Sequence, residues 1–482
     1  MYTKNDAKRE VSTEENDYRS PYRRDYARLI HSPSFRRLQG KTQLYPGLES
    51  DFFRNRLTHS LEVAQISKTM GHFINTNFLK DAPEKVDLDI CEFAGIAHDL
   101  GHPPFGHQGE EALDECMREA GGFEGNAQTL RILAKIEKKV KQSEPVRGQE
   151  YRFGLNLTYR SLASILKYDN EIPSVSANRL EEERDKAVKG YYGAEAELVK
   201  SVKENVAPRL DGKFKTIECQ IMDIADDIAY STYDLEDGFK AGFYHPTSFF
   251  SYPDTVFNNV AKKVGKALKK DEHANKDSFT ADEVKEVLFD LFKEIYNFDV
   301  EGLQTATDGL NDYIKIPSDV TKEALLAGIV NDISKASKNV AEDGYIRNIF
   351  TSELINTAID GVQFKLNEEN PALSKVYLEE NTRIKVEVLK NFTYESQILS
   401  PRLKVAEFRG KDIVQTIFEV LKEGEGWRLM PSDYQQVYHH FDEMPDRLRC
   451  ISDFISGMTD KYAIEFYGRL KSENPETIFK PF

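Results

Sequence analysis

The stretch from Ala97 to Glu110, A-H-D-L-G-H-P-P-F-G-H-Q-G-E, constrains the fold more than any other part of the sequence. Three histidines, an aspartate and a glutamate lie within it, and glycine and proline interrupt it repeatedly. The apolar run 93–97 just before it is typical of a buried helix, so His98 and Asp99 begin at the edge of the interior. A carboxylate there needs a cation or several hydrogen-bond donors to offset its desolvation. A metal ion is the simplest such cation, and we expect a metal-binding turn.

Composition limits the classes of protein to consider. The chain has 482 residues, of which 40% are hydrophobic and 30% charged, and no apolar run approaches the ~20 residues of a membrane span. The polar N-terminus lacks the apolar region of a signal peptide, so we expect a cytoplasmic protein with no membrane partner. The four cysteines form no C-x-x-C pair, which argues against a thiolate zinc site and a disulfide framework. A formal charge of −16 disfavours general adhesion to nucleic acid but leaves room for a local basic cleft.

Apolar residues recur at helical spacing along most of the chain, and sustained strand alternation is scarce, so the predicted fold class is mainly α. The clearest single helix spans residues 216–239. Asp226, Tyr230 and Asp234 step by four along one of its faces, so helical geometry stacks them in a column about 6 Å apart per turn. We therefore expect two carboxylates and a phenol to lie along one side of this helix.

A second helix is predicted over residues 54–71, with His59 in its first half and Gly71 at its C-terminal end. Arg56 precedes His59 by three residues, shares its helical face and can point a guanidinium at the same site. Divalent metals favour imidazole nitrogen and carboxylate oxygen, brought together from separate elements. His59, the pair His98-Asp99 and an aspartate of the 216–239 helix meet this requirement, with Asp226 and Asp227 competing for the last position.

The order H…HD…D resembles the HD superfamily of metal-dependent phosphohydrolases. More specific are R-R-L-Q-G-K-T-Q at 36–43, N-R-L-T-H-S-L-E-V at 55–63, H-D-L-G-H-P-P-F-G-H at 98–107, G-N-A-Q at 125–128 and A-D-D-I-A-Y at 225–230. Together these motifs resemble the deoxyguanosine triphosphate triphosphohydrolase (dGTPase) family, over about residues 20–240 and more thinly over 380–435. The resemblance implies an HD-domain helical core with an additional helical C-terminal region.

The family's reaction converts a deoxynucleoside triphosphate to a deoxynucleoside and inorganic triphosphate, and the resemblance implies a preference for dGTP. Attack at the α-phosphorus requires a metal to polarise the phosphoryl oxygen, a positioned water and cations for the charge. The donor set would accept Mn²⁺, Mg²⁺, Fe²⁺ or Zn²⁺, and we expect Mn²⁺ or Mg²⁺. Two alternatives stay open. One is an HD-type nucleotidase or cyclic-nucleotide phosphodiesterase, and the other is a non-catalytic regulator that binds nucleotides or nucleic acid.

The expected metal ligands are His59, His98, Asp99 and Asp226. Asp226 is preferred over Asp227 because it reproduces the family's column of ligand, Tyr at +4 and Asp at +8. His107 is expected to transfer protons, since imidazole titrates near neutrality, and Glu110 to hold its other nitrogen.

Substrate contacts follow from the resemblance. Arg56 is the expected phosphate clamp, and Tyr230 lies at the phosphates or the sugar. His102 is expected to contact phosphate, with a second-metal ligand as its alternative, and Lys167 and Tyr168 are weaker phosphate candidates. The 3′-hydroxyl is assigned to Gln43 and Asp234, and the sugar face to Tyr394. A site built to bond a hydroxyl discriminates strongly, because loss of that bond leaves a buried polar group unpaired.

Three regions are expected along the chain. Residues 1–240 form the HD-type catalytic core, with an N-terminal arm that docks as a helix and a polar, solvated insertion at 177–206. Residues 241–380 are a helical region of unknown role, and residues 381–482 a helical C-terminal region that contributes to the substrate pocket.

The resemblance also implies a homo-oligomer, typically a hexamer, regulated by a nucleotide effector or single-stranded DNA. The basic segments 19–41 and 135–141 are candidate surfaces for such partners. A run of charges is, however, usually only a solvated face.

Overall fold

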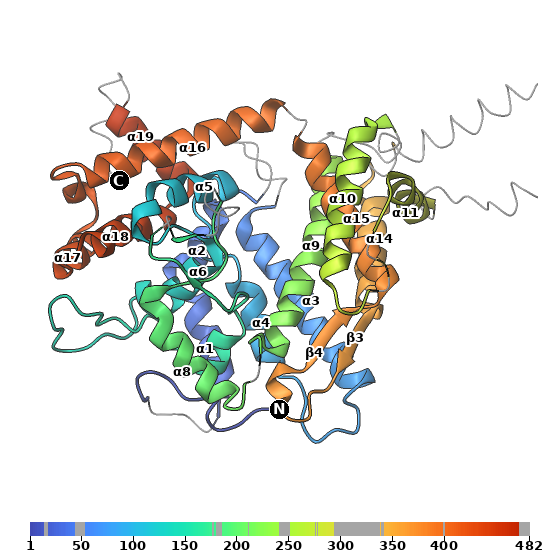
Figure 1. Cartoon of the computed structure of the whole chain (residues 1–482), viewed down its shortest axis with the longest axis horizontal. Helices are drawn as coiled ribbons and strands as arrows, with labels where there is room; N and C mark the ends of the chain where they lie inside the picture. The colour runs from blue at the N-terminus through green and yellow to red at the C-terminus, as the bar shows by residue number, and fades with distance from the viewer. Residues whose placement is uncertain are drawn as a thin grey trace, which may run out of the picture. The chain divides into compact units, whose positions relative to one another are not determined.

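The computed structural model describes residues 1–13, 18–43, 54–175, 178–179, 186–210, 212–240, 251–274, 276, 278–293, 338, 342–398 and 401–471. Helices make up most of this part of the chain (Figure 1), which confirms the mainly α prediction. Two short strand pairs accompany them, β1 (Glu171–Ile172) parallel to β2 (Tyr191–Tyr192), and β3 (Val362–Lys365) beside β4 (Lys375–Leu378). No helix in the described residues combines the length and apolar character that a membrane span requires.

The described chain divides into two compact units. Unit 1 comprises residues 1–226, 363–377 and 401–482, and unit 2 comprises 227–362 and 378–400. Unit 1 holds the helices α1 (Pro21–Ile30), α2 (Pro33–Arg37), α3 (Arg56–Asn77), α4 (Leu88–Ala97), α5 (Gly106–Cys116), α6 (Gly125–Arg131), α7 (Tyr159–Ala163), α8 (Ala196–Val206), α16 (Pro401–Lys422), α17 (Ser432–His440), α18 (Met444–Ser456) and α19 (Asp460–Lys471). Unit 2 holds α10 (Asp254–Lys270), α11 (Ala281–Lys293), α14 (Gly344–Asp360) and α15 (Glu380–Ile398), and α9 (Ile217–Lys240) carries the boundary between the units. The three-part division expected from the sequence follows other boundaries and stays a prediction.

The pairing of α3 with α4 is the closest helix contact that bears on the site. Asn55 and Thr58 cap α3 reciprocally, and the Asp87 carboxylate caps α4. A Cβ on Gly95 of α4 would lie 2.5 Å from the Ala64 Cα of α3, so only glycine allows the two backbones to approach this closely.

Gly71 does not end α3, as the sequence suggested, because the helix continues to Asn77. A Cβ at Gly71 would lie 2.9 Å from Leu88 Cδ2. The glycine therefore serves packing against α4 rather than helix termination.

The N-terminal arm is part of unit 1 and packs against the rest of that unit. Tyr22 and Leu29 of α1 are buried. The Arg160 guanidinium is 0% exposed and pairs with Asp6 of the arm, at 3.1 Å, and with Glu218, at 3.0 Å. Since a buried guanidinium is tolerated only when carboxylates surround it, these pairs anchor the arm to the helical core.

The segment 177–206 was expected to be a solvated insertion, and that expectation is wrong for the residues that the structure describes there. Helix α8 buries Leu198, Val199 and Val202 in the main apolar core of unit 1. Arg179 is also buried and pairs with Asp114 at 2.6 Å. Charged residues dominate the sequence of this amphipathic helix, and its apolar face is too short to stand out among them.

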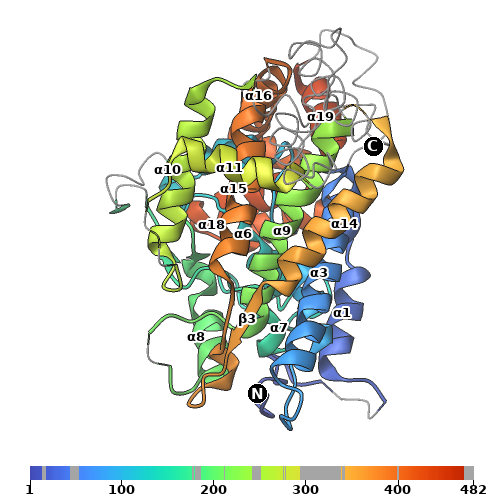
Figure 2. The same ribbon diagram turned by 90° about the vertical axis from the view of Figure 1, so that its right-hand side faces the viewer.

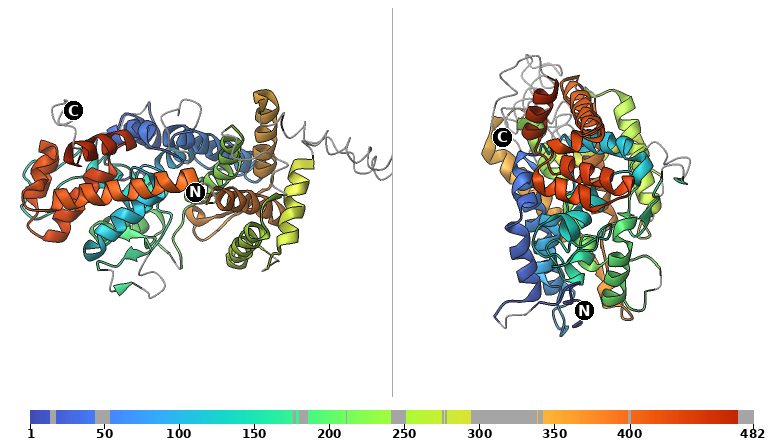
Figure 3. Two further views of the ribbon diagram at one scale, coloured as in Figure 1. Left: turned by 90° about the horizontal axis from the view of Figure 1, so that it is seen from above. Right: turned by 90° about the vertical axis from the view of Figure 1, so that its left-hand side faces the viewer.

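The C-terminal helices of unit 1 pack against α5, the helix that begins within the 97–110 segment. Ala112 and Leu113 of α5 share one apolar cluster with Ile417 and Phe418 of α16 and with residues of α18 and α19. Figure 3 shows α16 running along this helix in unit 1. In unit 2, α10 and α11 pack on α15 around a second apolar cluster (Figure 2).

The strands β3 and β4 lie within 241–380, a region expected to be helical. Their sequences V-Q-F-K and K-V-Y-L alternate over only four residues each. A pattern this short does not stand out against the surrounding helices.

Gly95→Ala tests the close approach of α3 and α4. The new methyl group must displace the α3 backbone at Ala64, and we expect a loss of about 1–3 kcal/mol in the free energy of unfolding, measured by denaturant titration. Gly468→Ala is the matched control, because a Cβ there meets nothing within 4 Å in α19. Gly468→Ala should leave the free energy of unfolding unchanged or raise it by up to about 1 kcal/mol. Equal stabilities of the two variants would contradict this account of the helix contact.

Candidate active site

Three side chains from three helices converge on one point in unit 1. His59 Nε2 of α3 lies 3.2 Å from Asp226 Oδ1 of α9, and His98 Nε2, at the end of α4, lies 3.5 Å from the same oxygen. His98 Nδ1 lies 2.7 Å from the Gly95 carbonyl oxygen and donates to it, which leaves the lone pair on Nε2. That Nε2 is buried and has no hydrogen-bond partner among the described residues. Two imidazoles and a carboxylate with this orientation fit a divalent metal ion.

The raised pKa of His98 shows that this point favours a cation. Burial opposes the charged imidazole, but Asp99 and Asp226 raise the pKa of His98 to about 9. Burial likewise opposes ionisation of Asp226, yet His98, His59 and Lys167 hold its pKa well below the ordinary value. A metal ion would take the place of the imidazolium proton between the carboxylates.

Asp226, and not Asp227, is brought beside the two histidines. Asp227 instead pairs with Lys390 at 3.1 Å and Arg383 at 3.3 Å, both from α15 of unit 2. The geometry therefore favours the first of the two aspartates as the ligand.

Asp99 is shared between neighbours on two sides. Its Oδ1 lies 3.6 Å from His98 Nε2 and 2.9 Å from His102 Nδ1, and its Oδ2 accepts a 2.6 Å hydrogen bond from Arg56 Nη1. Burial would raise the pKa of Asp99, but Arg56, His102 and His98 hold it well below its usual range. Asp99 stands beside the three-ligand group, where it can complete the coordination of a metal.

His107 and Glu110 form a second pair at the start of α5. His107 Nδ1 lies 3.2 Å from Glu110 Oε2, and the Gly125 amide donates to Glu110 Oε1 at 2.8 Å. Burial raises the pKa of Glu110, but the hydrogen bond with His107 and the charge of Lys189 outweigh it and keep the carboxylate ionised. The His107 side chain is 72% exposed, so its Nε2 is accessible to a ligand.

His102 contacts both Asp99, beside the first group, and His107 of the second pair. Its ring lies edge-on to that of His107, with 5.9 Å between centroids. His102, His107 and Glu110 also form a second set of side chains whose donor atoms lie close enough together to hold a metal. The structure thus leaves both predicted roles of His102 open.

Lys167 lies at the carboxylate end of the metal site. Its Nζ is 2.6 Å from Asp223 Oδ1 and 3.8 Å from Asp226 Oδ2. Burial opposes the ammonium charge, but these two aspartates raise the pKa of Lys167 well above its usual value. The adjacent Tyr168 is partly buried, with the Lys189 ammonium 6.0 Å from its ring centroid.

Gln43 lies on the segment that pairs with the start of α3, where Thr42 and Asn55 form an antiparallel bridge. Its Oε1 is buried and has no hydrogen-bond partner in the part of the chain that the structure describes. A hydroxyl donor from a substrate would satisfy this oxygen.

Three predicted substrate residues belong to unit 2. Tyr230 and Asp234 lie on α9, one and two turns after Asp226, with Asp234 buried. Tyr394 of α15 is 43% exposed, and the Lys263 ammonium lies 4.0 Å from its ring centroid. Tyr394 is therefore an accessible aromatic ring rather than a core residue.

Sequence reasoning missed Lys41, Lys189 and Asp460. Burial lowers the pKa of Lys41 to about 7, with Arg37 and Arg56 adding to the effect. Lys189 lies 3.9 Å from Glu110, in the segment expected to be solvated. Of these three residues, only Lys41 could have been found from the sequence, because it lies inside the motif at 36–43. The residues around Asp460 form no pattern that would single it out.

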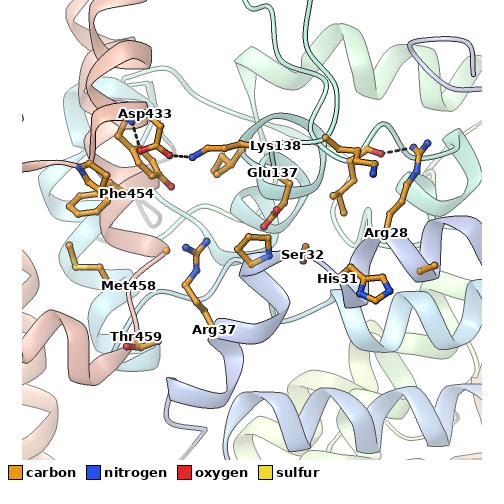
Figure 4. Close-up of a pocket in the computed structure, with 18 of the residues that line it drawn as sticks. Arg28, His31, Ser32, Arg37, Glu137, Lys138, Asp433, Phe454, Met458 and Thr459 are labelled. Carbon is orange, nitrogen blue, oxygen red and sulfur yellow. Dashed lines mark hydrogen bonds and ion pairs between the residues drawn. The ribbon is translucent and has the colours of Figure 1, made fainter. Parts of the chain in front are cut away.

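A cavity of about 780 Å³ lies apart from the metal ligands, in unit 1. Both basic segments singled out in the sequence line it, and Figure 4 shows Arg28, Arg37 and Lys138 around it. Burial and the charges of Arg9, Arg24 and Arg19 lower the pKa of Arg28 to about 10. Cationic side chains therefore lie close together around the cavity, and Asp433 and Glu137 are the acidic residues in its lining.

Comparisons with known proteins agree with this geometry. Residues 56–231 match the HD domain, and residues 376–469 match the phosphohydrolase-associated domain. The chain is 45% identical over 495 residues to deoxyguanosinetriphosphate triphosphohydrolase-like protein 2 of Mesorhizobium japonicum, with 100% of both chains covered. It is 30% identical over 484 residues to the deoxyguanosinetriphosphate triphosphohydrolase-like protein of Shewanella oneidensis, with 94% of each chain covered. It is 32% identical over 487 residues to that of Shewanella sediminis, with 94% of this chain and 93% of the relative covered.

The HD match begins at Arg56 and contains His59, His98 and Asp226, which the geometry brings to one point, and Asp99 beside them. A full-length relative at this identity leaves no part of the chain outside the likeness. The chain belongs to the deoxyguanosinetriphosphate triphosphohydrolase-like family of metal-dependent HD-domain phosphohydrolases.

Proposed function

We propose that this protein hydrolyses deoxynucleoside triphosphates, with a preference for dGTP, to a deoxynucleoside and inorganic triphosphate. The observation that carries the proposal is the His59–His98–Asp226 group, with the Arg56 guanidinium on the neighbouring Asp99 and the Lys167 ammonium beside Asp226. A phosphate ester is the substrate class that needs both a metal ligand set and flanking positive charge.

In this proposal His59, His98, Asp99 and Asp226 would hold a divalent metal, Mn²⁺ or Mg²⁺, which would supply Lewis-acid polarisation of the α-phosphoryl oxygen. Arg56, already oriented by its hydrogen bond to Asp99, presents its remaining N–H groups to the phosphates. Lys167, held by Asp223, adds a second positive charge, and His102 and Tyr168 complete the phosphate contacts.

His107 moves the proton. Because Glu110 is ionised and accepts from Nδ1, the exposed Nε2 is the atom that exchanges a proton with the attacking water or the leaving oxygen. Glu110 itself is fixed by the Gly125 amide, so the imidazole keeps one orientation.

Sugar recognition is assigned to Gln43 and Asp234 at the 3′-hydroxyl and to Tyr394 against the sugar face, with Tyr230 at the phosphates or the sugar. The unsatisfied Oε1 of Gln43 supports a bond to the 3′-hydroxyl. The exposed ring of Tyr394 supports stacking against the sugar. A sugar without its 3′-hydroxyl would leave the buried amide unpaired, and so would be discriminated against strongly.

The second donor group, His102, His107 and Glu110, favours one rival function. If it holds a second ion, the site resembles a two-metal phosphodiesterase or nucleotidase rather than a triphosphohydrolase. Metal content separates the two, since the rival requires two ions per chain for turnover.

Partners are also proposed. The likeness to the family supports a homo-oligomer, a hexamer by resemblance, which sedimentation equilibrium would reveal. The basic cavity between segments 19–41 and 135–141 is the proposed site for a nucleotide effector, with single-stranded DNA as the other candidate ligand. Its apolar wall of Phe454 and Met458 suits a flat base better than a bare phosphate.

The direct test supplies each of the four dNTPs and NTPs with Mn²⁺ or Mg²⁺ and separates the products by anion exchange. We expect inorganic triphosphate from dNTPs, and most rapidly from dGTP. Pyrophosphate or monophosphate as the first product would place the attack at another phosphorus. Absence of turnover together with tight nucleotide binding would point to a regulator.

Asp226→Asn and Asp227→Asn form a matched pair that tests the ligand register. Only the first removes a carboxylate beside His59 and His98, so we expect it to lose the bound metal and to slow turnover by more than about 100-fold. Asp227→Asn should keep the metal, because its carboxylate serves Lys390 and Arg383. Metal content by mass spectrometry gives the answer, and metal loss from the second variant alone would reverse the assignment.

Arg37→Gln tests the effector cavity, measured in a protein that also carries Asp226→Asn so that turnover does not interfere. Loss of one charge-assisted contact should weaken the binding of a fluorescent dNTP about tenfold. Arg36→Gln is the control, since Arg36 is exposed and does not line the cavity. If the two variants bind the nucleotide with equal affinity, and also bind a single-stranded oligonucleotide with equal affinity, this cavity is not the effector site.

A further inference from the structure

Asp460, the first residue of α19, connects two loops that approach the site from different parts of the sequence. Its Oδ2 accepts a 2.8 Å hydrogen bond from the Thr42 amide, and its Oδ1 accepts one of 3.0 Å from the Phe105 amide. Both oxygens of one carboxylate are thus occupied by backbone donors from segments more than sixty residues apart in the sequence. Charge-assisted bonds of this kind are about twice as strong as neutral ones.

Each of these segments leads directly to residues of the proposed reaction. Thr42 precedes Gln43 and bridges Asn55, the cap of the helix that begins at Arg56. Phe105 lies two residues before His107 and caps α5. Asp460 itself belongs to the C-terminal region and is far from these residues in sequence.

The Phe105 backbone needs such an anchor. Its φ of 65° is in the left-handed region, which a bulky aromatic residue rarely adopts and which persists only where the surroundings enforce it. On its side-chain face, Gly410 of α16 approaches so closely that a Cβ there would lie 2.7 Å from Phe105 Cβ. The C-terminal helices therefore hold both the main chain and the side chain of the residue that sets the start of α5.

Lys41 provides a second connection between the same three segments. Its buried Nζ donates to the carbonyl oxygens of His102, at 2.5 Å, and Ser456, at 2.8 Å. Gly40 lies against Thr459, where a Cβ would come within 2.7 Å of the Thr459 side chain. Segments 40–42, 102–105 and 456–460 are consequently joined by backbone-directed bonds at several points.

We infer that Asp460 is a positioning residue that fixes the loop carrying His107 relative to the segment carrying Gln43 and Arg56. The inference rests on the proposed function, because the importance of that relation follows from the roles assigned there. A displacement of about 1 Å between reacting groups can lower turnover 100-fold, so a link between the two loops bears directly on the rate.

Asp460→Asn removes one of the two acceptors while nearly preserving the size of the side chain. The amide oxygen can accept from only one loop, and the amide N–H₂ then faces the other backbone donor. We expect kcat for the preferred dNTP to fall about tenfold, with metal content unchanged. The preference for a dNTP over its 2′,3′-dideoxy analogue should also narrow, since Gln43 loses its fixed position.

Hydrogen exchange provides a readout that does not depend on the substrate. Peptides covering residues 38–43 and 102–109 should exchange faster in Asp460→Asn. Glu465→Gln is the matched control, an exposed carboxylate on the same helix, and it should leave exchange and kcat within twofold of the wild-type protein. Asp460→Glu keeps both acceptor oxygens and should recover part of the lost rate if the acceptors are what matters.

Faster exchange with kcat within twofold of wild type would overturn the inference, because Asp460 would then be a structural anchor alone. Unchanged exchange in both peptides would overturn it as well. If the wild-type protein cleaves no dNTP, the proposed function fails, and the same variants are compared on bis-p-nitrophenyl phosphate, a substrate of the metal centre that lacks a sugar. Equal rates of wild type and Asp460→Asn on that ester would then reject the inference independently.

Discussion

The free-energy cost of removing carboxylates from water is the constraint on which the site depends. Asp99 follows the end of the apolar helix α4, and Asp226 lies within α9, both at positions where an isolated carboxylate would be costly to desolvate. The protein offsets that cost with two imidazoles, the Arg56 guanidinium and the Lys167 ammonium. Because these cations come from α3, from the end of α4 and from the segment after α7, these elements must meet at this point for the charges to be balanced. The chemistry of the site and the packing of unit 1 therefore have one common cause.

Much of this centre could be predicted from the sequence, because its residues lie in short, strongly patterned segments. His98 and Asp99 follow an apolar helix directly, and the 216–239 helix has an apolar stripe through Ile217, Ile221, Ile224 and Ile228. Asp226 and Asp227 could be separated only by the resemblance to the family, whose ligand is followed by Tyr at +4 and Asp at +8, and the ion pairs of Asp227 with α15 give the physical reason for the difference. Local periodicity thus supplied the helices, and the resemblance supplied the choice between the two aspartates.

Other features could not be predicted, because they depend on contacts between distant segments. The buried face of α8 consists of a few apolar residues amid charged ones, so its composition resembles that of a solvated segment. Gly71 resembles a helix terminus until the neighbouring Leu88 shows that it is a packing residue. Asp460 is an ordinary aspartate at the start of a helix, and its two hydrogen bonds reach backbone amides, which carry no residue-specific signal. Interactions of side chains with distant main chain are invisible to pattern reading.

Gly95 has two tasks that are usually carried by different residues. Its missing side chain lets α3 and α4 touch, and its carbonyl oxygen accepts the Nδ1 proton of His98, which fixes the tautomer of that imidazole. Any residue would supply this carbonyl, but a larger side chain that pushed α3 and α4 apart would also move the carbonyl relative to His98. A compensating change at Ala64 that made room for a larger residue could restore the stability of the helix pair and still leave the carbonyl displaced from His98 Nδ1. Protein engineering aimed at the thermal stability of this fold should treat the glycine as part of the chemistry.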